Sequence, residues 1–197
     1  MSNKMFGEKL ENLATECAAC NKCELASSRT NIVFGSGNDS AQVMFIGEAP
    51  GKNEDLRGEP FVGAAGKLLN ELLCGIGLER EDIYIANILK CRPPKNRNPK
   101  SEEVELCTPW LQKQIDLIKP AVIVTLGNFP TRFILQTKEG ITALHGKVCT
   151  VDGFCVLPMF HPAAAIYDRK KIESLRTDFA LLKDILDNGL SHKLLQD

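Results

Sequence analysis

Three polar side chains suited to catalysis or ligand binding stand at or near the ends of apolar runs. Glu48, Asn87 and His161 lie at or just beyond the ends of the runs VMFI, IYIANI and CVLPMF. Short apolar runs bounded by turn residues are typical of buried strands. Parallel strands place their carboxyl ends at one edge of a sheet, where open α/β sheets bind ligands. We therefore expect these three side chains to meet in one crevice.

A stretch rich in glycine and acidic residues follows the first of these runs. Residues 47–66 read GEAPGKNEDLRGEPFVGAAG and lead into an apolar helical pattern at 66–74. A long irregular loop inside a compact domain is usually functional. This position between a strand and a helix indicates a binding loop. The alternative is a surface loop in which the glycines only make turns.

The eight cysteines are the second group of residues that could do chemistry. Cys17, Cys20 and Cys23 make two overlapping C-x2-C pairs, in which two thiolates can reach one metal centre from a tight turn. Cys91 and Cys107 bracket a basic, proline-rich loop and one helical turn. Disulfides are rare in a reducing compartment, so we expect metal ligands, catalytic groups or buried apolar thiols.

The composition is that of an ordinary globular protein. The 197 residues are 44% hydrophobic and 25% charged, and they predict a single domain spanning 1–197. No apolar run approaches the roughly 18 residues of a membrane span. The N-terminal sequence MSNKMFGEKLENLATEC has no apolar core, so we expect a cytoplasmic protein. A net charge of −1 argues against nonspecific coating of DNA but permits a local basic rim.

Strand and helix patterns alternate along the chain and predict an α/β fold. Strands are expected at 43–46, 83–88, 121–127 and 155–160. Helices are expected at 5–17, 66–74, 101–118, 128–136 and 172–188. Shorter β structure is expected within 29–40 and 140–156. The alternation predicts a three-layer α/β/α arrangement around a central four-stranded parallel sheet.

Five segments, in this order, resemble the motifs of one known family. They read CNKCELASSRT at 20–30, GEAPGKNED at 47–55, RGEPFVGAAGKLL at 57–69, NILKCRPPKNRNP at 87–99 and MFHPAA at 159–164. The sequence resembles the family-4 uracil-DNA glycosylases, the iron–sulfur branch of the uracil-DNA glycosylase superfamily. The resemblance implies that superfamily's fold. It also implies a monofunctional DNA N-glycosylase that flips uracil out of DNA and hydrolyses its N-glycosidic bond to start base excision repair.

The resemblance further implies a [4Fe–4S] cluster, which needs four thiolates. The family's ligand positions correspond to Cys20, Cys23, Cys91 and Cys107. An N-terminal helix and these segments would form the cluster-binding part of the domain. Zinc accepts the same four ligands, so the sequence does not separate the two metals. Cys17 matches no family position and is interpreted as a bystander, and Cys74, Cys149 and Cys155 are predicted to be core thiols.

The residues matched to the family suit the chemistry of base excision. An extruded uracil needs an aromatic platform, and Phe61 matches that position. A side-chain amide offers one donor and one acceptor, so Asn87 can pair with both O4 and N3–H of uracil and reject cytosine. Bond cleavage leaves a uracil anion, and His161 matches the position that hydrogen-bonds uracil O2 and stabilises this charge.

The residue that positions the attacking water is left open by the sequence. In the better-known branch of the superfamily an aspartate activates the water, and the corresponding residue is Ala49, which we expect to contact the substrate. Glu48 is the first candidate, either by ordering water or by binding uracil through its backbone. Glu54 is the second candidate and could instead exclude the C5 methyl group of thymine. Asn96 is a third polar candidate near the pocket.

Uracil-containing DNA, single- or double-stranded, is the expected partner, and the protein is expected to be a monomer. Basic residues in the loops of the same face are expected to meet phosphates. They are Arg92, Lys95, Arg97, Arg169, Lys170 and Lys171.

Two alternative functions remain open at this point. One is an iron–sulfur protein that binds uracil-DNA, or becomes covalently trapped on it, without turnover. The trapping branch carries a basic, histidine-bearing insertion near 91–99, whereas the loop CRPPKNRNP has no histidine. The other is an iron–sulfur module that binds nucleic acid or transfers electrons without hydrolysing a bond.

Overall fold

The computed structural model describes residues 2–166 and 168–189. Within them, six strands form one sheet in the order β1-β3-β2-β4-β6-β5. The strands are β1 (Ser36–Gly37), β2 (Val43–Gly47), β3 (Tyr84–Asn87), β4 (Val122–Leu126), β5 (Cys149–Val151) and β6 (Phe154–Met159). The strands β3, β2, β4 and β6 pair in parallel, which confirms the predicted four-stranded parallel core.

Two short edge strands make the sheet wider than the predicted four strands. β1 pairs antiparallel with β3, and β5 pairs antiparallel with β6. Both lie in segments for which the sequence predicts short β structure, although the sequence does not show that these strands join the central sheet. For Ile141–Leu144, within 140–156, the β prediction is wrong, because these residues form a short helix. β1 has 2 residues and β5 has 3, too few for a period of apolar residues to be recognised.

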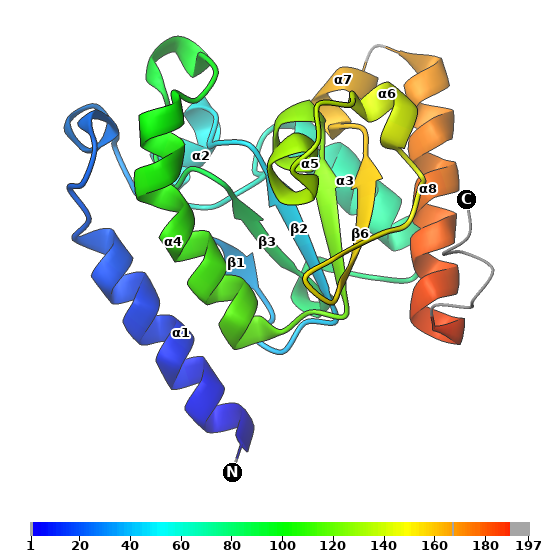
Figure 1. The fold of residues 1–197 in the computed structure, drawn as a ribbon, viewed down its shortest axis with the longest axis horizontal. Coiled ribbons are helices and arrows are strands. Elements are labelled where there is room, and N and C mark those ends of the chain that lie inside the picture. The colour runs from blue at the N-terminus through cyan, green and yellow to red at the C-terminus, as the bar shows by residue number, and fades with distance from the viewer. Residues whose placement is uncertain (1, 167, 190–197) are drawn as a thin grey trace.

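Helices cover both faces of the sheet (Figure 1). The α-helices are α1 (Ser2–Ala18), α2 (Lys52–Arg57), α3 (Ala64–Gly75), α4 (Ser101–Ile118), α5 (Asn128–Leu135), α6 (Ile141–Leu144), α7 (Pro162–Ala165) and α8 (Arg169–Asn188). Short 3-10 turns are η1 (Glu24–Ser27), η2 (Arg80–Asp82) and η3 (Pro94–Asn96). Figure 1 shows α1 and α4 together on one side of the strands and α8 on the other. In the described residues, no helix is long and apolar enough to cross a membrane.

Side chains that alternate along the strands create two apolar layers. Along β2, Val43 and Phe45 belong to the core beneath α3 and α8, where the ring of Phe45 stacks on Phe179 with centroids 5.9 Å apart. Met44 and Ile46 belong to the core beneath α1 and α4. Because each face of the sheet is covered by helices, the predicted three-layer α/β/α arrangement is confirmed.

The sequence predicts an irregular loop over 47–66. This prediction is wrong in part, because the stretch contains the helix α2. Gly51 precedes this helix, and Gly58 ends it in a left-handed conformation with φ of 74°. The buried carboxylate of Asp55 accepts a hydrogen bond of 2.9 Å from the backbone N–H of Thr30. Polar contacts fix α2 in place, so apolar periodicity could not predict it.

The last helix begins at Arg169 rather than at residue 172. The carboxylate of Asp168 caps it by accepting hydrogen bonds from the N–H groups of Lys170 and Lys171. An aspartate at this position satisfies donors that the first turn of a helix leaves unpaired. The cap therefore places three basic residues in the first turn of α8.

Candidate active site

The carboxyl ends of the parallel strands meet at the edge of the sheet toward which β6 points in Figure 1, beside α7. Gly47, the last residue of β2, pairs with Asn87, the last residue of β3. His161 lies two residues beyond the end of β6. The parallel register thus brings Glu48, Asn87 and His161 to the wall of one pocket.

This pocket has a volume of about 360 Å³, within the range of sites that enclose small ligands. Its wall includes every residue to which the sequence analysis gives a catalytic or substrate-binding role. They are Glu48, Ala49, Glu54, Phe61, Asn87, Asn96 and His161. They come from strand ends, from α2 and η3, and from the turn before α3, so only the folded chain assembles them.

Two glycines let the pocket side chains approach the main chain closely. The rings of Phe61 and His161 stack with 5.4 Å between centroids and 26° between planes. A Cβ atom at Gly47 would lie 3.0 Å from the Phe61 ring and would overlap Oδ1 of Asn87. At Gly127, whose φ is 95°, an added Cβ would lie 3.2 Å from the Cβ of His161. Glycine at both positions therefore leaves space for the ring pair and the amide.

His161 is held in one tautomer by the start of α7. Its Nδ1 accepts a hydrogen bond of 3.1 Å from the backbone N–H of Ala163. Burial lowers the pKa of His161 to about 4, although the nearby charge of Glu54 acts in the opposite direction. The imidazole is therefore neutral at about pH 7 and carries its proton on Nε2, which makes that atom a hydrogen-bond donor.

Asn87 is 2% exposed and presents its amide to the pocket. Its backbone carbonyl accepts a hydrogen bond of 2.8 Å from Nζ of Lys90, which also donates to Oε1 of Gln114 at 2.6 Å. No residue in 2–166 or 168–189 hydrogen-bonds the Asn87 amide itself, so its donor and acceptor remain for a ligand. No role for Lys90 is predicted from the sequence; the signal that could have found it is a lysine that directly follows the buried apolar pair Ile88 and Leu89.

The two glutamates of the pocket make different contacts. Oε1 of Glu54 accepts hydrogen bonds from the N–H groups of Val62 and Gly63, both at 3.0 Å, and so holds the turn that carries Phe61. The carboxyl group of Glu48 has no hydrogen-bond partner among the described residues, and burial raises its pKa. Glu48 is therefore available to a ligand or to a water molecule.

The basic loop after β3 is tied together by its own side chains. Nε of Arg92 donates to Oδ1 of Asn96 at 2.7 Å. The guanidinium of Arg97 pairs with the carboxylate of Glu103 on α4. Arg92 and Arg97 thus already have acidic or polar partners, and Asn96 has one hydrogen-bond acceptor in use.

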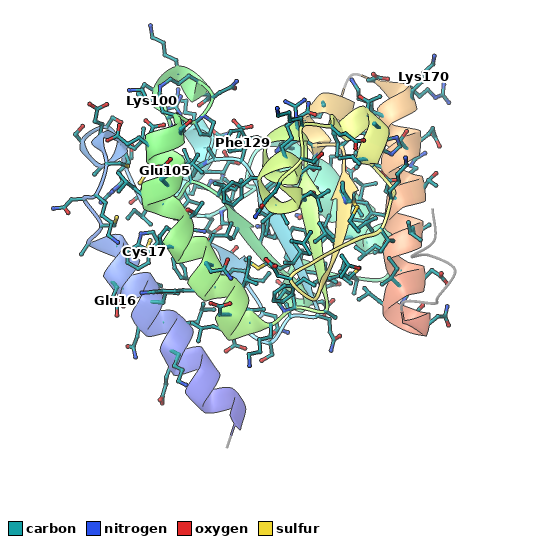
Figure 2. All side chains as sticks on the ribbon, in the orientation of Figure 1. Glu16, Cys17, Lys100, Glu105, Phe129 and Lys170 are labelled. Atoms are coloured by element: carbon teal, nitrogen blue, oxygen red, sulfur yellow. The ribbon has the colours of Figure 1, made fainter. Side chains whose placement is uncertain are left out.

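Further basic residues lie at the same end of the molecule. Figure 2 shows Lys100 near the start of α4 and Lys170 near the start of α8, at that end but on opposite sides of the molecule. Both side chains are exposed. Lys100 lies 3.3 Å from a Glu24 carboxylate oxygen, an exposed ion pair of the kind that contributes little. These lysines therefore remain accessible to an anionic partner.

A second, smaller hollow lies beside the end of α1 and beside α4, and five cysteines line it. They are Cys17, Cys20, Cys23, Cys91 and Cys107. Figure 2 shows Cys17 on α1, next to α4, and its side chain is fully buried. Nη1 of Arg29 donates to Sγ of Cys91 at 3.4 Å, and the backbone N–H of Lys90 donates to Sγ of Cys107 at 3.3 Å.

The donor set of this hollow fits a group that binds thiolates. Soft thiolate ligands select iron–sulfur clusters or zinc. The indole N–H of Trp110, which also lines the hollow, is buried without a hydrogen-bond partner in the described part of the chain. Sulfur acceptors would satisfy this donor, and Arg29 and Lys90 would offset their negative charge. No three His, Cys, Asp or Glu side chains of the described residues converge on the position of a single metal ion.

The remaining cysteines differ in their burial. Cys155 is 4% exposed and belongs to the core, as the sequence predicts, and Cys149 is half-buried. The prediction for Cys74 is wrong, because this thiol is exposed on α3. Leu72 and Leu73 of the same helix are buried, and the helical period turns the next side chain toward solvent.

A parallel sheet core with a pocket at the carboxyl ends of its strands is typical of α/β proteins that bind ligands at this edge. The chain belongs to the uracil DNA glycosylase superfamily, whose family model matches residues 34–186. It is 46% identical over 186 residues to the type-4 uracil-DNA glycosylase of Archaeoglobus fulgidus, covering 90% of this chain and 94% of that relative. It is 44% identical over 190 residues to the type-4 enzyme of Saccharolobus solfataricus, covering 92% and 88%. With the Thermotoga maritima type-4 enzyme the identity is 43% over 164 residues, covering 82% and 85%. Within the superfamily, the chain is thus one of the type-4 uracil-DNA glycosylases.

Proposed function

We propose that this protein is a monofunctional DNA N-glycosylase that excises uracil from DNA and so starts base excision repair. The proposal rests on the pocket in which Phe61, Asn87 and His161 offer a ring, an amide without a hydrogen-bond partner among the described residues, and a neutral imidazole. An extruded uracil needs these groups, because its N-glycosidic bond cannot be reached inside the base stack. The similarity to type-4 uracil-DNA glycosylases supports the same reaction.

Base recognition is assigned to Phe61 and Asn87. The ring of Phe61 supplies the platform on which the flipped uracil stacks. The Asn87 amide donates to O4 and accepts from N3–H, whereas cytosine presents the reverse pattern at these positions. Because the amide is buried, a base that does not pair with it leaves polar groups unsatisfied, at a cost of about 1–3 kcal/mol.

Stabilisation of the leaving group is assigned to His161. As the glycosidic bond lengthens, negative charge builds on O2 of uracil, and the Nε2–H of His161 donates a hydrogen bond to it. The lowered pKa of His161 supports a neutral donor rather than an imidazolium that delivers a proton. The N–H of Ala163 occupies Nδ1 and keeps the donor on the other nitrogen.

The role of positioning the attacking water is assigned to Glu48 rather than to Glu54. Glu54 already accepts two backbone hydrogen bonds through Oε1, which supports a role in holding the turn that carries Phe61. Glu48 has a carboxyl group without a protein partner in the described residues, and it lines the pocket. Ala49 lies beside it in the wall, and Asn96 contributes polar surface on the side of the basic loop.

A [4Fe–4S] cluster is assigned to four thiolates of the second hollow. Its ligands are Cys20, Cys23, Cys91 and Cys107. When bound, the cluster supplies covalent cross-links between the N-terminal segment and the loop that leads from Asn87 to α4. The resemblance of these cysteine segments to the iron–sulfur branch of the superfamily supports this group over zinc, which accepts the same four ligands. Cys17 lies in the same hollow as a fifth thiol without an assigned metal bond.

DNA binding is assigned to the basic residues around the strand ends. Exposed Lys95, Lys100 and Lys170 would contact phosphates on either side of the flipped nucleotide. We infer that the protein acts as a monomer on single- or double-stranded DNA. We also infer a cytoplasmic location, supported by the DNA substrate of the related enzymes and by the need for reduced thiols at the second hollow.

The test uses end-labelled DNA that carries one uracil, in G·U, A·U and single-stranded form, with G·T as a further substrate. The protein should leave an alkali-sensitive site at uracil, and His161→Ala should slow its formation by roughly 100-fold or more. A protein that keeps its cysteine-bound cluster but produces no alkali-sensitive site would contradict the proposal. A DNA adduct that survives denaturing electrophoresis would then favour covalent trapping, and a retarded complex without an adduct would favour simple binding.

A further inference from the structure

Phe61 has a backbone conformation that a phenylalanine rarely adopts. Its φ is 53°, in the left-handed region that favours glycine. The residue is buried, and its ring stacks on His161. A conformation of this kind persists only where the surrounding structure holds it in place. The orientation of the ring therefore depends on whatever fixes the backbone of this turn.

One side of the turn is held through its N–H groups. Oε1 of Glu54 accepts from Val62 and Gly63 immediately after Phe61. This contact fixes the start of α3 but leaves the carbonyl groups that precede it without a partner from α2.

Arg80 holds the other side of the turn through its carbonyl groups. Nη2 of Arg80 donates to the carbonyl of Pro60 at 2.7 Å, and Nη1 donates to the carbonyl of Phe61 at 3.1 Å. Nη1 also lies 3.3 Å from Oδ1 of Asn70 on α3. The planar guanidinium suits this paired contact because its N–H groups have a fixed spacing, which the single ammonium of a lysine lacks.

The Phe61 carbonyl has little freedom to turn elsewhere. It is pressed against α3 at Gly66, where an added Cβ atom would overlap it. Rotation of the peptide bond toward a relaxed conformation would remove this carbonyl from Arg80 and move the ring away from His161. The guanidinium, Gly66 and Glu54 thus enclose the turn on three sides.

We propose that Arg80 is a positioning residue for uracil excision, which acts by fixing the left-handed Phe61 so that its ring meets the flipped base. The proposal rests on the proposed function and adds to it a residue from η2 that does not line the pocket. Arg80 has no expected contact with uracil or with the reacting atoms. Its effect on the reaction should therefore pass entirely through Phe61.

A double-mutant cycle on the full protein with its cluster tests this dependence. The variants are Arg80→Met, Phe61→Ala and the double variant, compared by single-turnover rates on DNA carrying one uracil. Arg80→Met should slow excision roughly 10- to 100-fold when Phe61 is present. In the Phe61→Ala background, the same change should slow it less than about threefold, because there is no ring left to misplace.

Two controls separate this role from a loss of stability. Arg176→Met removes an exposed arginine paired with Glu173 and should leave the rate unchanged. Arg80→Lys keeps the charge but loses the paired geometry, and it should give an intermediate rate and an intermediate affinity for free uracil as a product inhibitor. If Arg80→Met does not fold, the same cycle is run with Arg80→Lys.

Equal losses from the arginine change in both backgrounds would overturn the proposal, because they would mean that Arg80 acts on the fold or on DNA rather than through Phe61. An unchanged rate in Arg80→Met would overturn it as well. A wild-type protein without uracil excision would instead contradict the proposed function, so the two failures are distinguishable.

Discussion

Nδ1 of His161 accepts a hydrogen bond of 3.1 Å from the backbone N–H of Ala163. An acceptor at this nitrogen cannot carry a proton, so the neutral ring has its proton on Nε2. Pro162 and Ala163 begin α7, and the short helix thus sets the tautomer of the side chain that precedes it. The contact turns an imidazole at a strand end into a fixed hydrogen-bond donor.

The pH dependence of catalysis should reflect this neutral imidazole. The pKa of His161 is lowered to about 4, so this residue does not titrate between about pH 5.5 and pH 8. We therefore expect the profile of kcat/KM for uracil excision to have no limb from His161 in this range. The measurement is kcat/KM against pH for wild type and His161→Gln. An acidic limb near the ordinary histidine value of 6.5 that disappears in the variant would contradict the assignment.

Stability should depend on the same group. The pKa of His161 is about 4 in the folded protein and 6.5 for an ordinary histidine, so the unfolded chain binds more protons between these values. The neutral ring therefore contributes to the free energy of unfolding above the unfolded pKa, and this contribution is lost as the pH falls from about 6.5 toward about 4. Urea unfolding at several pH values should show that wild type loses stability relative to His161→Gln over this range. If the two proteins differed in free energy of unfolding by the same amount at every pH, His161 would not be the group that titrates.

The close approach at Gly47 predicts a loss of activity from one added methyl group. In Gly47→Ala the Cβ atom would overlap Oδ1 of Asn87 and crowd the Phe61 ring, so we expect excision to fall roughly 100-fold. The matched control is Gly75→Ala on α3, where an added Cβ meets nothing within 4 Å. That change should keep the activity and raise the free energy of unfolding by about 0.5–1 kcal/mol. Equal activity in the two variants would show that the contact is tolerated.

Replacing a cysteine of the second hollow should change the iron content of the protein, whereas replacing the exposed Cys74 should not. Cys91→Ser or Cys107→Ser should abolish the bound iron and sulfide and loosen the N-terminal segment, because each removes one of four assigned thiolates. Cys74→Ser is the control, since this thiol is exposed. Iron and sulfide analysis with limited proteolysis measures both effects.

Cys17→Ala provides a finer test of the ligand set. We expect it to keep four irons per chain, because this fifth thiol has no assigned metal bond. Loss of iron from Cys17→Ala with retention in Cys20→Ala would reverse the roles of these two residues.

The buried ammonium of Lys90 predicts a large effect on stability. Lys90→Met would leave the carbonyl of Asn87 and Oε1 of Gln114 without their donor, and we expect a loss of about 2 kcal/mol. For a chain of this length, this corresponds to a fall in Tm of about 4–8 °C. Thermal unfolding measures this fall in Tm. Lys183→Met is the control, since the ion pair of Lys183 with Asp187 is exposed. Similar Tm values for the two variants would contradict a structural role for the Lys90 contacts.

The amino-acid sequence by itself determined the central architecture. Four apolar runs separated by helical patterns predict parallel strands, and strand ends in such a sheet share one edge. For that reason Glu48, Asn87 and His161 could be expected in one place without any coordinates, and the motifs shared with a known family extended the expectation to Phe61 and the cysteines. These features depend on the period and order of residues, which the sequence carries directly.

Tertiary structure alone decided how the site residues are held. Arg80 reaches the carbonyl of a residue 19 positions earlier, and Asp55 fixes a short polar helix by contacting Thr30. Cys74 turns outward although its neighbours are apolar, and Cys17 joins the other thiols because α1 packs on α4. Such contacts join segments that are distant in sequence, and they depend on the direction of single side chains and on left-handed backbone such as that of Phe61. No periodic pattern records these properties, so they become apparent only when the layers have packed.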